Sequence, residues 1–160
     1  MPLNLAGADL KGFDVLPSGL YPCTVFEITD TAVKEGSTGT LPAGTQGINV
    51  QFRVSQGEHE NRRFFNKYWL APVTIDGKPY ENKAKMDGMF ARFFMALGIS
   101  EEEVTSGDFE PNYEELVGLP VCVVVGQKPK YGGPEGEMDN EVKGVKPIDA
   151  YSAPTTGGIE

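Results

Sequence analysis

The sequence predicts a mainly β protein of five strands, with one amphipathic helix between strands three and four. Glycine (20 residues) and proline (12 residues) are frequent in the 160-residue chain, which favours a turn-rich β protein over a helix bundle. Strand-like runs recur between turn residues, whereas one segment alone has the 3.6-residue period of a helix. The length and the apolar fraction of 39% suit a single domain with a modest core.

The chain divides into three expected regions. We predict an N-terminal arm at 1–18, a folded domain at 19–149 and a flexible tail rich in serine, threonine, glycine and proline at 150–160. No apolar run approaches the roughly 18 residues needed to span a bilayer. The N-terminus also lacks the basic segment and apolar stretch of a secretory signal. We therefore expect no membrane partner and a cytoplasmic location.

The first strand is predicted at 20–34, where Tyr21, Cys23 and Val25 share one side and β-branched residues follow. A loop at 35–47, rich in glycine, serine and threonine, joins it to the second strand. The loop lacks the Gly-Lys-Ser/Thr ending of a phosphate-binding P-loop. We therefore interpret it as a connection between two strands.

The second strand, 48–54, alternates apolar and polar residues without a break, which is the pattern of a half-buried strand. Its apolar face predicts contact with a core. Its other face is free to touch a ligand and carries Asn49, Gln51 and Arg53.

The third strand, 62–70, mixes basic and aromatic residues and fits two registers. In the favoured register, the inward side chains are Phe64, Tyr68 and Leu70. The outer face then continues that of the second strand with Arg63, Phe65, Lys67 and Trp69. In the alternative register, Phe65 and Trp69 belong to the core and Tyr68 is the exposed ring. Either register leaves an aromatic ring beside a cation.

One amphipathic helix is predicted where apolar residues recur at helical spacing, and Gly98 is placed to end it. The apolar stripe consists of Met86, Met89, Phe90, Phe93, Phe94 and Leu97. The segment 101–115 follows and holds seven carboxylates, which is typical of a solvated surface segment.

Strands four and five are predicted at 121–128 and 141–148, joined by a glycine-rich loop. Three strands, a helix and two further strands are the order of an OB-fold, a five-stranded barrel. This fold binds oligonucleotides across strands two and three, between the loops that join strands one to two and four to five. The sequence therefore predicts an OB-fold barrel with its one amphipathic helix between strands three and four.

The formal net charge of −9 is unevenly distributed. Residues 51–95 hold eight basic and five acidic residues, whereas 96–160 hold four basic and thirteen acidic residues. An acidic protein with one basic stripe still attracts a polyanion locally. The basic stripe coincides with the hairpin of strands two and three.

Basic residues interleaved with aromatic rings on an exposed sheet are typical of a platform for single-stranded nucleic acid, because rings stack on bases while cations contact phosphates. Lys128, Lys130 and Tyr131, at the end of strand four, would close on the strand from the other side. The full set of predicted DNA-binding residues is Asn49, Gln51, Arg53, Arg62, Arg63, Phe65, Lys67, Tyr68, Trp69, Lys128, Lys130 and Tyr131.

Short motifs in a fixed order over 19–148 carry a resemblance to a known family. The motifs are Gly19-x-Tyr21, Phe52-x-Val54-x-x-Gly57, Arg62-Arg63-x-Phe65, Ala96-Leu97-Gly98, Leu116-x-Gly118-x-Pro120-Val121, Asn140-Glu141-Val142 and Lys146-Pro147. In these the chain resembles the phage and prophage family of OB-fold single-stranded DNA-binding proteins. The chain departs from it at Asn61, where members often have glycine, and in a tail that is neither strongly acidic nor aromatic.

The resemblance implies a protein that coats single-stranded DNA in phage-type replication, recombination or repair, without strong sequence specificity. It implies replication or recombination proteins as partners and the host cytoplasm as the location, and it leaves homo-oligomerisation open. The alternative function is a structural or assembly module on an OB-like barrel, which the net acidity favours.

Catalytic and metal-binding patterns are weak in this sequence, so we expect a protein that is not an enzyme and needs no cofactor or metal. His59 lies in a turn between two glutamates, which is typical of an exposed residue. The acidic run 135–141 lacks EF-hand spacing, although a Mg²⁺-dependent nuclease there is the third hypothesis. Cys23 and Cys122 lie in strand-like runs and predict two buried free thiols, with a disulfide left open.

Overall fold

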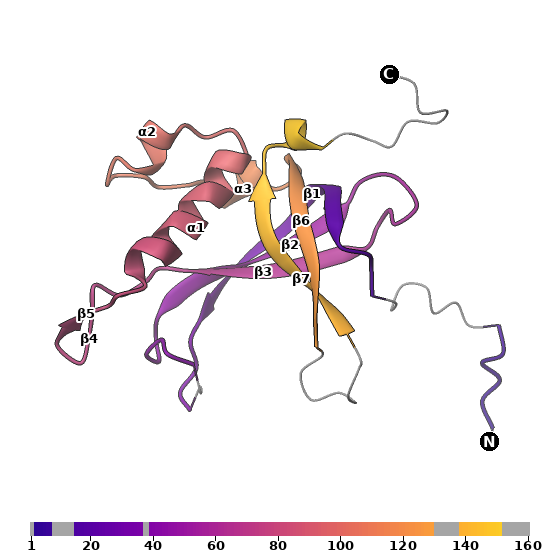
Figure 1. The fold of residues 1–160 in the computed structure, drawn as a ribbon, viewed down its shortest axis with the longest axis horizontal. Coiled ribbons are helices and arrows are strands. Elements are labelled where there is room, and N and C mark those ends of the chain that lie inside the picture. Colours follow the sequence, from indigo (N-terminus) through magenta and orange to yellow (C-terminus); the bar gives the residue numbers. More distant parts are fainter. Residues whose placement is uncertain (1, 8–14, 37–38, 130–137, 152–160) are drawn as a thin grey trace.

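The computed structural model describes residues 2–7, 15–36, 39–129 and 138–151 (Figure 1). Its main body is an antiparallel sheet of five strands in the order β3-β2-β1-β6-β7. The strands are β1 (Gly19–Ala32), β2 (Gln46–Val54), β3 (Arg63–Trp69), β6 (Pro120–Pro129) and β7 (Met138–Lys146). The predicted mainly β class with five long strands is confirmed. Within the described residues the sheet is open, because β3 and β7 are its two edges and share no ladder.

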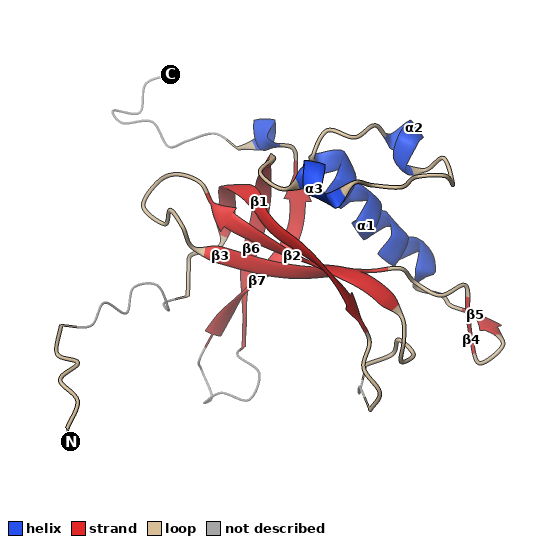
Figure 2. Ribbon diagram, turned by 180° about the vertical axis from the view of Figure 1, so that it is seen from behind, coloured by secondary structure: helices blue, strands red, loops and turns tan. Residues whose placement is uncertain are grey.

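The α-helices lie together on one side of the sheet (Figures 1 and 2). The predicted helix is α1 (Lys83–Ala96), and it does lie between the third and fourth long strands. Gly98, with a φ of 101°, follows its last turn as expected. The shorter elements are the hairpin β4 (Thr74–Ile75) and β5 (Lys78–Pro79), the helices α2 (Glu101–Val104) and α3 (Tyr113–Leu116), and the 3₁₀ helix η2 (Ile148–Ala150).

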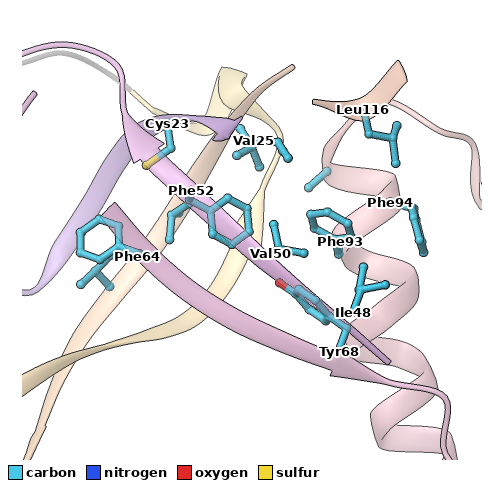
Figure 3. Close-up of a cluster of buried hydrophobic side chains, with 14 of the residues drawn as sticks. Cys23, Val25, Ile48, Val50, Phe52, Phe64, Tyr68, Phe93, Phe94 and Leu116 are labelled. Carbon is cyan, nitrogen blue, oxygen red and sulfur yellow. The ribbon is translucent and has the colours of Figure 1, made fainter. Parts of the chain in front are cut away.

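The core lies between α1 and the inner face of the sheet (Figure 3). Phe93 of α1 is fully buried, stacks on Tyr68 of β3 at 4.9 Å between ring centroids, and meets Phe52 of β2 edge-on at 6.1 Å. Burying a side chain of this size stabilises the fold by roughly 1.5–3 kcal/mol. The aromatic stripe predicted from the helical period therefore fixes where α1 sits.

The favoured register of the third strand is confirmed for its strand residues. Phe64 and Tyr68 are buried, whereas Arg63, Phe65 and Lys67 are exposed. Leu70 lies on the helical side of the sheet beside Phe90 and Phe94, as the favoured register predicts, but its side chain is 62% exposed and does not join the core. The last ladder pair is Gly47 with Trp69, so Leu70 lies just beyond the strand that the core covers.

The segment before β1 is held against β6 and β7. Leu16, which we assigned to the arm, is only 2% exposed and packs in the core. Its backbone N–H donates to Asn140 Oδ1 at 2.8 Å, and its carbonyl accepts from Asn140 Nδ2 and Gln127 Nε2, each at 2.9 Å. One amide side chain thus satisfies both backbone groups of Leu16, which allows that residue to be buried.

The acidic segment between α1 and β6 is only partly a solvated surface. Its carboxylate residues are exposed as predicted. Its apolar residues, however, pack against the core: Val104, Phe109 and Tyr113 are half-buried and Leu116 is buried. These residues do not form a continuous period, so the sequence pattern did not reveal their packing.

The two cysteines are buried free thiols, as predicted. They lie on neighbouring strands, where Cys23 pairs with Val121 and Pro22 pairs with Cys122. Because successive residues of a strand point to opposite faces, the two thiols lie on opposite faces of the sheet. Burial raises the pKa of Cys23 to about 12 and also raises that of Cys122.

None of the helices in the described part of the chain is long and apolar enough to cross a membrane.

Candidate nucleic-acid interface

The outer face of β1, β2 and β3 lies opposite the core. Residues that pair directly across an antiparallel ladder point to the same face of the sheet. Four ladder pairs therefore build one continuous surface, which we call the platform face. These pairs are Gly47 with Trp69, Asn49 with Lys67, Gln51 with Phe65, and Arg53 with Arg63.

The β3 row of the platform face alternates cations with aromatic rings along the edge strand. Phe65 is 57% exposed, although a phenylalanine on a sheet would normally be covered. Arg63 and Lys67, on either side of Phe65 in this row, are also exposed, and Trp69 is half-buried. Asn49, Gln51 and Arg53 of β2 are half-buried beside them. The structure therefore brings together seven of the predicted DNA-binding residues.

Phe26 of β1 also belongs to the platform face, and the sequence analysis missed it. The guanidinium carbon of Arg63 lies 4.3 Å from the centre of the Phe26 ring, and that of Arg53 lies 4.9 Å from it. A cation over an aromatic ring is stabilised by about 0.5–1 kcal/mol at an exposed site. Phe26 thus holds one arginine from β2 and one from β3 over a single ring.

A β-bulge in β1 explains why Phe26 points outward. The ladder between β1 and β2 shifts between Val25 and Glu27, so one extra residue is inserted there. Val25 pairs with Phe52 and Ile28 pairs with Val50. The two β1 residues are therefore three positions apart, whereas their partners on β2 are two positions apart. The sequence signal was this broken alternation between Val25 and Ile28, which predicts an irregularity in the strand.

Arg63 is also fixed by a hydrogen bond across the ladder. Its Nη1 donates to Gln51 Oε1 at 2.9 Å. A guanidinium has five N–H donors, so this bond and the contact with Phe26 orient the group while leaving it donors for a phosphate. The arrangement is a preoriented cation beside the exposed ring of Phe65.

The Trp69 ring packs close to the backbone of β2 at its ladder partner, Gly47. A Cβ atom added to Gly47 would lie 2.6 Å from Cε3 of Trp69 and 2.5 Å from the carbonyl oxygen of Tyr68. Glycine is therefore required at this position by a close approach. Trp69 also lines a small cavity of about 50 Å³ together with Met86 and Met89 of α1.

The platform face also carries one acidic residue and three threonines from β1. Thr24 pairs with Arg53, Glu27 with Gln51, Thr29 with Asn49, and Thr31 with Gly47. The three cations Arg53, Arg63 and Lys67 therefore outnumber the single carboxylate of Glu27 on this face. The local charge is positive on a protein whose net charge is −9.

Three further predicted residues lie away from the platform face. The prediction of Tyr68 as an exposed ring that stacks on DNA is wrong, because its side chain is only 4% exposed. Burial also raises the pKa of Tyr68 to about 12. Arg62 lies just before β3 and near Tyr21. Burial raises the pKa of Tyr21, and the positive charge of Arg62 partly opposes this shift. Lys128 is exposed near the end of β6, beyond the residues of that strand that pair with β1. Its ladder partner is Asp139 of β7.

Two further predicted DNA-binding residues, Lys130 and Tyr131, lie outside the described part of the chain. So do residues 135–137 of the predicted acidic run. His59 is half-buried, with its ring centre 6.0 Å from that of Tyr21 and its Nε2 3.9 Å from Glu58. Among the residues that the structure describes, no group of three or more histidine, cysteine, aspartate or glutamate side chains could hold a metal ion.

No protein-family model matches the chain, and no curated protein is significantly similar to it.

Proposed function

We propose that this protein binds single-stranded DNA along the platform face, without strong sequence preference, in phage-type replication, recombination or repair. The observation that carries the proposal is the row Arg63, Phe65, Lys67 and Trp69, which alternates cation and ring on one face of an edge strand. Rings stack on any base, and cations contact any phosphate backbone. This chemistry therefore binds single-stranded nucleic acid with little preference for its base sequence.

The spacing of the two rings suggests how a strand would lie. Phe65 and Trp69 are four residues apart, so they are separated by about 13–14 Å along the strand at about 3.3–3.4 Å per residue. Bases that stack on these two rings are therefore not neighbours in the nucleic acid. Lys67 lies between them and would contact the intervening phosphate, while Arg53 and Arg63 would contact the backbone beyond Phe65.

The strand order supports the OB-fold as the finer description of this sheet. The OB-fold is a five-stranded, partly open Greek-key barrel that binds oligonucleotides on strands two and three. The corresponding strands here are β2 and β3, which carry the platform face, and α1 precedes the fourth long strand β6. In this arrangement the loop 130–137 would flank the bound strand, with Lys130 and Tyr131 as proposed contacts.

A binding assay with matched variants tests this proposal. We expect a fluorescent oligo-dT to bind with an affinity that falls steeply with salt, because bound cations release counterions from the phosphates. The double variant Arg63→Ala/Phe65→Ala should lose most of this affinity, since stacking alone is worth about 1–3 kcal/mol per base.

The control is Val73→Ala, which removes an exposed apolar side chain from the segment after β3. It should bind like the unchanged protein. Equal affinity of the control and the double variant, or an affinity that does not depend on salt, would reject the proposal. Absence of any oligonucleotide binding would favour a structural or assembly module instead.

A further inference from the structure

A groove on the helical side of the protein is separate from the platform face. It has a volume of about 280 Å³ and lies between α1, the residue that follows β3, and the segment between α1 and β6. Its apolar wall is formed by Leu70, Phe90, Phe94, Val104, Phe109 and Tyr113. Figure 1 shows α2 and α3 beside α1 at this side of the sheet.

Apolar side chains around the groove remain in contact with water. Leu70 in its wall is largely exposed, as is Val73 in the same segment after β3. Val104, Phe109 and Tyr113 in the wall are half-buried. An exposed apolar patch bordered by polar residues is typical of a protein interaction site.

The border of this groove is acidic. The segment 101–115 contains seven carboxylates and no lysine or arginine, and the three glutamates Glu101, Glu102 and Glu103 form the exposed first turn of α2. Asp30 lies close enough to the groove residue Tyr113 to affect its pKa. Burial raises the pKa of the Tyr113 phenol, and the negative charge of Asp30 raises it further.

Basic residues from α1 only partly offset this charge. Lys83 is paired with the groove residue Asp87 at 2.8 Å, and the other two basic residues of α1 are Lys85 and Arg92. Negative charge around an apolar groove complements a partner that is basic as well as apolar, and it repels nucleic acid.

We propose that this groove binds a protein segment in which aliphatic or aromatic side chains are flanked by lysine or arginine. The apolar side chains enter the groove between Leu70 and Phe109, and the flanking cations meet the carboxylates of 101–115. Lysine and arginine suit this border because their stems cover apolar surface while their charged ends reach the rim. A polyanion and this partner would then occupy separate faces, so that both can be bound at once.

The test is an NMR titration of the ¹⁵N-labelled full chain with three synthetic peptides. The peptide KKLFKK should cause saturable shifts in the amides of Leu70, Phe94 and Val104. The peptides KKAAKK and EELFEE, which lack the apolar pair or the positive charge, should bind at least about tenfold more weakly. Equal binding of KKAAKK, or no saturable binding of KKLFKK, would overturn the proposal.

Three variants locate the binding and keep the test independent of folding. Ala91→Phe fills the groove from α1 and should abolish binding, whereas Val117→Ala, an exposed apolar residue outside the wall, should leave it unchanged. Glu102→Lys/Glu103→Lys changes exposed side chains alone and should weaken binding. Binding that is insensitive to these changes would place the peptide elsewhere. Self-association lost in Ala91→Phe would assign the groove to a second copy of the chain, against the proposal.

Discussion

Arg63 of β3 lies over the ring of Phe26 of β1, with 4.3 Å between its guanidinium carbon and the ring centre. The strand β2 lies between them in the sheet, so this contact reaches across two ladders. It joins the three strands of the platform face through side chains as well as hydrogen bonds. The contact has direct consequences for binding and stability.

Replacing Phe26 with leucine should weaken oligo-dT binding several-fold. The change keeps an apolar side chain but removes the ring that orients Arg53 and Arg63. The free energy of unfolding should fall by about 1 kcal/mol, the order expected for two exposed cation–π contacts. Fluorescence anisotropy and urea unfolding measure the two effects. Phe26→Tyr is the control and should retain both; unchanged affinity in Phe26→Leu would show that the ring does not orient the arginines.

Replacing Gly47 with alanine should destabilise the fold by about 1–3 kcal/mol, the usual cost of overpacking. The new Cβ would lie 2.5 Å from the backbone oxygen of Tyr68, which cannot rotate away. Gly144→Ala on β7 is the matched control, because nothing lies within 4 Å of its added Cβ. Chemical denaturation compares the two variants. Equal midpoints would contradict the close approach of Trp69 to β2.

Replacing Phe93 with alanine should cost about 3–5 kcal/mol of stability, as for other large-to-small changes in a core. Phe93 is fully buried and contacts Phe52, Tyr68 and Phe94. Met89→Ala, at a side chain of the same helix that is 43% exposed, should cost much less. Thermal unfolding followed by circular dichroism measures the difference. A small loss for Phe93→Ala would mean that α1 does not anchor the core.

Stability should decrease as the pH rises above 9, in part because of Cys23. Burial raises the pKa of its thiol from 9.0 to about 12, so the unfolded chain releases this proton at a lower pH than the folded chain. The contribution is complete below pH 9 and is lost as the pH approaches 12. Urea unfolding at about pH 8 and about pH 10 should show about 1 kcal/mol more loss for the unchanged protein than for Cys23→Ala. Equal losses would contradict the shift.

The regular parts of the fold were predictable because their side-chain periods are unbroken. The alternation from Ile48 to Val54 gave the faces of β2, and pairing with that strand gave the outward positions of Arg63, Phe65 and Lys67. The Met/Phe period likewise gave α1. Each pattern shows which face of a single helix or strand packs on the core. A short stretch of sequence is enough to contain such a pattern.

The unpredicted features depend on residues that are distant in the chain. Phe26 faces outward because of a bulge, and its role depends on arginines from two other strands. Leu16 is buried because Asn140 satisfies its backbone. Leu70 is exposed because the ladder ends one residue earlier. No local period encodes these contacts.

The most direct test of the platform face uses the single tryptophan of the chain, Trp69. Its fluorescence should be quenched when oligo-dT is added at low salt, the quenching should weaken as salt increases, and duplex DNA should have little effect. This result would place a base on or beside the indole ring. Unchanged fluorescence, together with no mobility shift of the oligonucleotide, would contradict single-strand binding on this face.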